Sequence, residues 1–213
     1  MNTQEMLDAA LGLAGLDKCP ADAAVIVPGE GIEKVLCGID MNTPELLVAK
    51  MMGYDCVVGH HPRNTDLKGM VDLFREQMYA MHEQGVPLNE AQKLIETGAT
   101  KMADADHGFN FNRNASAAEV LRMPFVCIHT PADIIVEKGI QKLLDERFAD
   151  KPRVKLKEII DVLGEVDEYK RAIFPPKIAV GSPDSYAGKI HVVMSGVTGG
   201  GPDVYKAYFR AGV

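Results

Sequence analysis

Two short apolar runs joined by one short helix constrain the fold of this chain more than any other feature. Residues 35–39 are typical of a buried strand, residues 43–45 of a helix N-cap and first turn, and residues 56–58 of a second buried strand. Pro44 in the first turn and Gly53 after residue 52 mark the limits of the helix. A strand, a helix and a strand in so few residues predict a βαβ unit whose parallel strands are buried on both faces.

The rest of the chain extends this α/β pattern. From Asp66 to Met81, apolar residues at three- and four-residue spacing predict a long amphipathic helix. We expect other helices at 3–13, from the Asn89 cap, from the Ser116–Glu119 capping box, at 130–148 and at 202–210, and other strands at 23–27, 125–128, 177–180 and 189–194. Residues 151–171 are charged, and we expect them to be helical in places and to link two halves of the chain.

Charge and hydropathy exclude several classes of protein. The 213 residues are 46% hydrophobic, which is enough for a packed core. The 23 basic and 30 acidic residues give a net charge of −7, and no segment is rich in Lys and Arg, so we do not expect nucleic acid as a partner. No leader and no apolar run long enough to cross a bilayer is found, which predicts a cytoplasmic protein without a membrane partner.

The cysteines favour reduced thiols over a disulfide framework. Cys19, Cys37, Cys56 and Cys127 stand singly, and the last three lie in apolar, strand-like runs, so we expect those three to be buried. Without a C-x-x-C pair, the chain has no local signature of a thiolate zinc site.

Paired histidines follow the second strand of the βαβ unit. His60 and His61 lie where ligands collect in open α/β sheets, in the crevice beyond the carboxyl ends of the strands. On an extended backbone neighbouring side chains point to opposite sides, so we expect each histidine to serve one of two adjacent metal ions. Pro62 favours extended geometry at His61.

A second pair of candidate ligands follows the strand at 125–128. His129 ends that strand, and Asp133 lies four residues later in the first turn of the next helix. Imidazole and carboxylate on one face suit zinc, iron or manganese. A bridging carboxylate between two ions is typical of water-activating centres. The alternative for His129 is a loop residue that makes a hydrogen bond, and for Asp133 a cap on its own helix.

Other histidines and loops are weaker candidates. Asp104, Asp106 and His107 offer ligand types, but the surrounding Gly and Asn residues favour a turn within a polar loop at 104–113. His82 is interpreted as a boundary residue of the amphipathic helix. His191 alternates within its predicted strand and is interpreted as a core or face residue. The glycines at 196–201 lack a Walker lysine or a dinucleotide pattern, which favours a tight turn.

Three segments together resemble a known family. Residues 39–45, residues 53–62 with their Gly-His-His-Pro end, and residues 128–133 with their His-x-x-x-Asp spacing are similar to the Nif-three-like dinuclear metal centre family, some of whose members are described as GTP cyclohydrolase 1 type 2 homologues. The resemblance implies that the metal ligands are His60, His61, His129 and Asp133.

The family resemblance also implies an architecture and an assembly. It implies two related α/β lobes with mixed or mostly parallel sheets, and a homo-hexamer whose metal sites face an internal cavity. Residues 1–150 would form the first lobe, which carries the ligand motifs, and residues 151–213 the start of a second lobe or an insert, incomplete here. The family's further His-x-x-x-Glu ligand segment has no counterpart after Asp133. The long stretch 63–122 between the motifs is expected to form a lid or an altered pocket.

The leading functional hypothesis is a metal-dependent hydrolase of a nucleotide or another small polar metabolite, with two divalent ions per subunit. In it, metal-activated water attacks the substrate and the ions stabilise the developing negative charge. The general base is unassigned, and Asp106 or His107 would assist if their loop folds over the site. The alternative is a non-catalytic metal-binding or scaffold protein, which tight, slowly exchanging metal without an open coordination position would favour. An α/β domain without metal would require all four candidate ligands to be coincidental.

Overall fold

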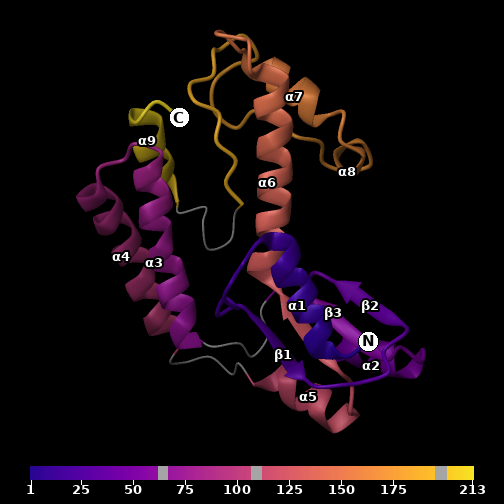
Figure 1. Cartoon of the computed structure of the whole chain (residues 1–213). Helices are drawn as coiled ribbons and strands as arrows, with labels where there is room; N and C mark the ends of the chain where they lie inside the picture. Colours follow the sequence, from indigo (N-terminus) through magenta and orange to yellow (C-terminus); the bar gives the residue numbers. More distant parts are fainter. Residues whose placement is uncertain (62–66, 107–111, 195–200) are drawn as a thin grey trace.

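A four-stranded mixed sheet forms the centre of the computed structural model. The structure describes residues 1–61, 67–106, 112–194 and 201–213. Within them the sheet has the order β1-β4-β3-β2, with bounds Ala23–Val27 for β1, Phe125–Ile128 for β4, Cys56–Gly59 for β3 and Val35–Gly38 for β2 (Figure 1). β2, β3 and β4 are parallel to one another, whereas β1 is antiparallel to β4. This mixed sheet confirms the α/β fold class.

The predicted βαβ unit is present. β2 and β3 pair in parallel from Val35 with Cys56 onward, and α2, Thr43–Met51, connects them. The N-cap of α2 is Asn42, one residue earlier than predicted. The Asn42 N–H donates to the Glu45 carboxylate at 2.9 Å, as in a capping box. That bond satisfies one of the donors left over at the start of the helix.

The prediction that both strands of this unit are buried on two faces was wrong for β2. β2 is an edge strand of the sheet, and Cys37 in it is exposed. Cys56 and Cys127, in the two central strands, are buried as predicted, and all four cysteines are free thiols. The local apolar pattern could not separate an edge strand from a central one, because strand order depends on distant pairings.

Helices account for most of the remaining described chain. Their bounds are Thr3–Ala14 (α1), Leu67–Glu83 (α3), Leu88–Asp106 (α4), Arg113–Leu121 (α5), His129–Phe148 (α6), Leu156–Leu163 (α7), Asp167–Lys170 (α8) and Pro202–Arg210 (α9). Two predicted boundaries were wrong, since α4 extends to Asp106 and into the expected polar loop, and α5 begins three residues before Ser116. The Ser116 N–H donates to Asn112 O at 2.9 Å, so Ser116 is already inside the helix. α7 and α8 confirm that residues 151–171 are helical in places, whereas the expectation that they link two halves of the chain stays a prediction.

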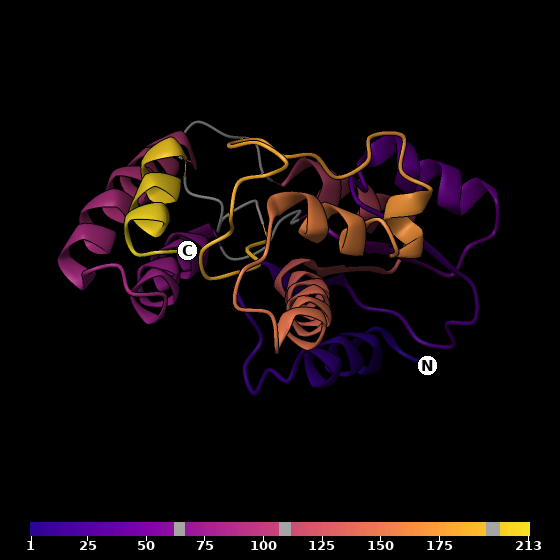
Figure 2. The same cartoon turned by 90° about the horizontal axis from the view of Figure 1, so that it is seen from above.

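Helices cover both faces of the sheet (Figure 2). On one face Val57 and Phe125 pack with residues of α2 and α5, and on the other Cys56 and Val126 pack with Leu7 of α1. Neighbouring strand residues thus contribute to opposite cores, as strand geometry requires. Both central strands are fixed from two sides, which holds their carboxyl ends in place.

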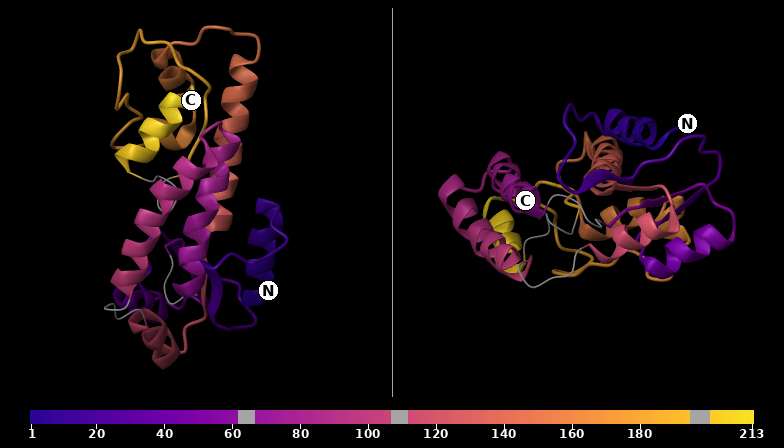
Figure 3. Two further views of the ribbon diagram at one scale, coloured as in Figure 1. Left: turned by 90° about the vertical axis from the view of Figure 1, so that its left-hand side faces the viewer. Right: turned by 90° about the horizontal axis from the view of Figure 1, so that it is seen from below.

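A separate helical group lies beside α6 (Figure 3). α3 and α4, from the long stretch between the two motifs, pack against each other, and α4 also packs against α9. Their shared core contains Met81, Val86, Ile95, Val204 and Tyr208. None of the described helices combines the length and the hydropathy needed to span a bilayer.

The strands predicted at 177–180 and 189–194 do not form. A strand needs a paired neighbour, and in the described part of the chain only the isolated bridge between Lys155 and Tyr186 lies near these segments. Val180 is 68% exposed. The chain is held instead by single main-chain bonds, such as Lys189 N–H to Gly212 O at 2.7 Å. An apolar alternation therefore did not suffice to make a strand here.

Candidate metal centre

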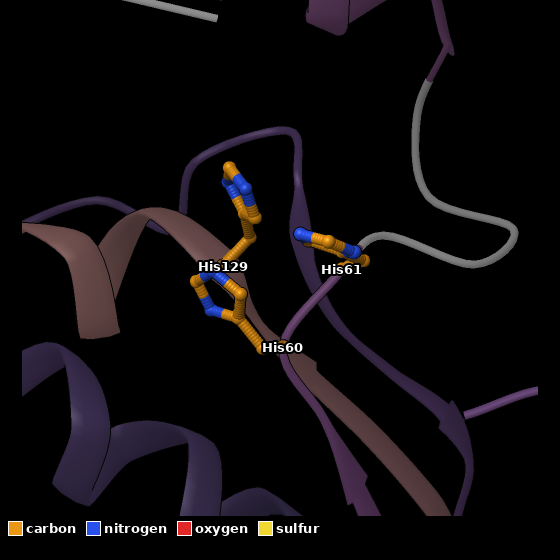
Figure 4. A group of neighbouring side chains, drawn as sticks. All are labelled: His60, His61 and His129. Atoms are coloured by element: carbon orange, nitrogen blue, oxygen red, sulfur yellow. The ribbon is translucent and has the colours of Figure 1, made fainter. Parts of the chain in front are cut away.

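The carboxyl ends of β3 and β4 bring three histidines to one edge of the sheet (Figure 4). His60 and His61 follow β3 directly, and His129 is the first residue of α6, directly after β4. The His60 N–H donates to Gly38 O at 3.0 Å and the His61 N–H to Ile39 O at 2.9 Å. These bonds continue the β2–β3 pairing and fix the backbone of both histidines.

The three imidazoles converge. One nitrogen from each of His60, His61 and His129 lies within 4.8 Å of the other two. The ring centroid of His60 is 5.1 Å from that of His61 and 4.5 Å from that of His129. The expectation that His60 and His61 point to opposite sides was therefore wrong, because β3 ends at Gly59 and the chain bends at both histidines.

Asp133 lies next to two of these rings. One carboxylate oxygen is 3.4 Å from His60 Nε2, and the other is 3.8 Å from His129 Nε2. His129 and Asp133 lie four residues apart on α6, which places them on one face of the helix. The structure thus brings together all four residues that the sequence motifs singled out.

Two further carboxylates orient the imidazoles from outside. Asp22 is fully buried, and its Oδ2 accepts from His129 Nδ1 at 2.8 Å and from the Thr130 hydroxyl at 2.7 Å. Asp40 lies 2.8 Å from His61 Nδ1. When Nδ1 carries the proton, Nε2 keeps its lone pair for a ligand, which is the arrangement that metal-binding histidines use.

Asp22 and Asp40 were missed by the sequence reasoning. Asp40 follows β2, so a search of every residue after a parallel strand would have found it. Asp22 precedes β1, and it reaches this edge only because β1 is antiparallel to β4, with Ala23 opposite Ile128. No local signal in the sequence gives that direction.

Burial shifts the pKa values of the site residues. Burial, and then the nearby His129, lower the pKa of His60. Burial raises the pKa of the Asp133 carboxyl, although His129 and His60 oppose this. Burial would also lower the pKa of His129, but the hydrogen bond to Asp22 and the charges of Asp22 and Asp133 outweigh it and raise that pKa.

The other candidate ligands do not join this cluster among the described residues. His82 is exposed, and its Nδ1 lies 3.0 Å from Val86 O at the end of α3, as expected of a boundary residue. The His191 ring lies beside the Tyr208 ring, with the centroids 5.8 Å apart and the planes tilted by 44°. The predictions for His107 and for the glycines at 196–200 lie outside the described residues, as does the side chain of Asp106.

A solved structure matches the whole chain. The crystal structure of a NIF3 superfamily protein from Sphaerobacter thermophilus aligns with a TM-score of 0.95 and 32% sequence identity, over 100% of this chain and 78% of that chain. The chain belongs to the NIF3 superfamily. No family model and no curated protein matches it. The structural match confirms the family resemblance seen in the sequence motifs.

The donor set of this NIF3 superfamily protein fits a divalent transition metal. Three imidazole nitrogens and a carboxylate are ligands that zinc, iron and manganese accept. A cation beside His60 and Asp133 would offset the cost of burying them, because it binds the neutral imidazole and the ionised carboxylate. The His60, His61 and His129 cluster could therefore hold a metal ion.

We expect Asp22→Asn to weaken metal binding about 10- to 100-fold, the usual effect of losing the outer partner of a ligand histidine. The neutral amide stabilises the Nδ1–H of His129 less well than the buried carboxylate does. Isothermal titration of the chelator-treated protein with zinc measures the change. Thr130→Val is the matched control, because it removes the other bond to Asp22 and leaves His129 in place. Wild-type affinity in Asp22→Asn would rule out this orienting role.

Proposed function

We propose that this NIF3 superfamily protein is a dinuclear metal-binding hydrolase that acts on a small metabolite. The observation that carries the proposal is the convergence of His60, His61 and His129 with Asp133 beside them. These four residues would hold two divalent ions, with zinc, iron or manganese as the candidates. The closeness of one Asp133 oxygen to His60 and of the other to His129 supports a bridging role for this carboxylate.

The chain's own residues supply binding and orientation. Asp22 and Asp40 hold the Nδ1 sides of His129 and His61, which leaves both Nε2 atoms for the ions. When bound, two divalent ions supply Lewis acidity and acidify water in the site. The buried Asp22 holds His129 rigidly, so little reorganisation is needed when ligands bind.

Family resemblance supports a proposal about assembly and organisation. We propose a cytoplasmic homo-hexamer, in which residues 1–150 form the lobe with the metal centre and residues 151–213 belong to a second lobe or an insert. The position of the whole sheet and of all four candidate ligands within 1–150 supports this division. Sedimentation of the purified protein would test the assembly, and a monomer at micromolar concentration would contradict it.

A metal-dependence assay tests the hydrolase. Purified protein should hydrolyse at least one compound in a panel of amides, esters, cyclic amidines and nucleotides, lose this activity with a chelator, and regain it with zinc or manganese. Asp133→Ala should stay inactive under all conditions, while His82→Ala, at an exposed histidine outside the centre, should behave as wild type. Full metal occupancy with no hydrolysis of any class would contradict the hydrolase and favour the non-catalytic metal-binding alternative.

A further inference from the structure

A pocket of about 280 Å³ extends from the candidate metal centre along α6. His129 and Asp133 line its near end, and residues of α3, of α9 and of the segment 191–194 line the rest. Asp133 and Glu137 both face it from α6. Four residues of helix rise by about 6 Å, so the pocket reaches one helical turn beyond the centre.

The far end of the pocket is polar. Glu137, His191 and Tyr208 meet there, and Glu137 accepts from the Met194 N–H at 3.3 Å. Tyr208 is only 6% exposed and lines the pocket beside His191, with ring centroids 5.8 Å apart. Its hydroxyl can donate a hydrogen bond to a ligand group in the pocket or accept one from it.

The two aromatic side chains at this end are neutral near pH 7. Burial, and then the charge of Glu137, raise the pKa of the Tyr208 hydroxyl. Burial lowers the pKa of His191, although Glu137 opposes this. Both groups therefore offer hydrogen bonds without a positive charge. Glu137 is the residue that makes the far end of the pocket negative.

Acidic side chains dominate the charge around the pocket. Asp133, Glu76, Glu83 and Glu137 all line it, and among the described lining residues there is no lysine or arginine. A phosphate group would meet carboxylates here, whereas a cation would find a partner. Leu73, Ile134 and Val193 supply apolar walls, and the volume lies at the lower end for small-molecule sites.

We propose that this pocket binds the part of the substrate that does not react, and that it selects a small ligand with an apolar body and a cationic amine or amidine end over a phosphorylated nucleotide. The ligand's cationic end pairs with Glu137 and hydrogen-bonds to Tyr208, and its reacting group lies beside Asp133. This inference rests on the proposed function for the reacting end, whereas the pocket's charge preference does not depend on metal.

Three planar compounds of nearly equal size test the preference. Benzamidine carries a positive charge, benzamide none and benzoate a negative charge, and each is titrated into the full chain while the ring NMR signals of His191 and Tyr208 are followed. We expect benzamidine to bind at least about 10-fold more tightly than benzoate, the size of one charge-assisted hydrogen bond. Benzamidine should still bind more tightly than benzoate in chelator-treated protein, where the carboxylate of benzoate has no metal ion to bind.

Variants locate the source of the preference. Glu137→Gln should reduce the benzamidine preference to less than about threefold with unchanged zinc content, because its amide no longer pairs with a cation. Glu146→Gln, on the same helix but outside this pocket, should leave the preference intact. Equal or tighter binding of benzoate to the chelated wild type, or binding that leaves the His191 signal unmoved, would overturn the proposal. A retained preference in a protein that binds no metal would instead overturn only the hydrolase.

Discussion

His60→Ala and Asp133→Ala should each weaken metal binding by more than the roughly 100-fold that loss of an outer hydrogen-bond partner costs at most. Each change removes a proposed ligand atom, so fewer donor atoms remain to hold the metal ion. Both side chains are partly exposed, at 25% and 17%, so the fold should tolerate the smaller residue. Zinc titration of chelator-treated protein gives the affinities, and elemental analysis gives the metal content as purified.

His82→Ala serves as the control for this pair. It also removes a histidine, but one that is exposed and lies outside the cluster. The two metal-site variants should unfold in urea at nearly the wild-type midpoint when metal is absent, which separates lost ligation from lost structure. If metal content in both variants equals that of the wild type, the proposed ligands are wrong.

Phe125→Ala should lower the free energy of unfolding by about 3–5 kcal/mol, as large-to-small changes of buried aromatic residues do. Phe125 is fully buried in β4 and belongs to the core shared with α2 and α5. It also lies close under Gly59, where an added Cβ would meet the Phe125 ring at 3.1 Å. Since small domains have only about 5–15 kcal/mol of stability, a large part of it should be lost.

Urea unfolding followed by circular dichroism measures this loss. Phe174→Ala is the matched control, because Phe174 is 88% exposed and its removal should change stability by less than about 0.5 kcal/mol. Equal effects of the two substitutions would contradict the assignment of the core.

A further expectation is that the wild type gains stability from saturating zinc, since ligands that bind only the folded state stabilise it.

Local patterns in the sequence were enough to predict the βαβ unit and the edge at which the histidines meet. Val35 and Cys56 begin runs joined by a helix, which is the crossover connection that parallel strands need, and the carboxyl ends of parallel strands lie at one edge. His60 and His129 follow two such strands. Their proximity in the structure was therefore within reach of sequence reasoning.

Features that depend on distant pairing were not within reach. Asp22 contacts His129 because β1 runs antiparallel to its neighbour, and Cys37 is exposed because β2 lies at the edge. The apolar alternation around His191 indicated a strand, but the described chain places no partner beside it. The mutual orientation of His60 and His61 depends on a bend after β3 that residue types alone do not specify.

Anomalous diffraction from crystals grown with zinc and, separately, manganese would show whether the histidine cluster binds metal. We expect a strong anomalous peak within coordination distance of the Nε2 atoms of His129 and His61, with an Asp133 oxygen nearby. Crystals in which both metals bind only elsewhere on the molecule, and in which this cluster shows no peak, would contradict the proposed metal centre.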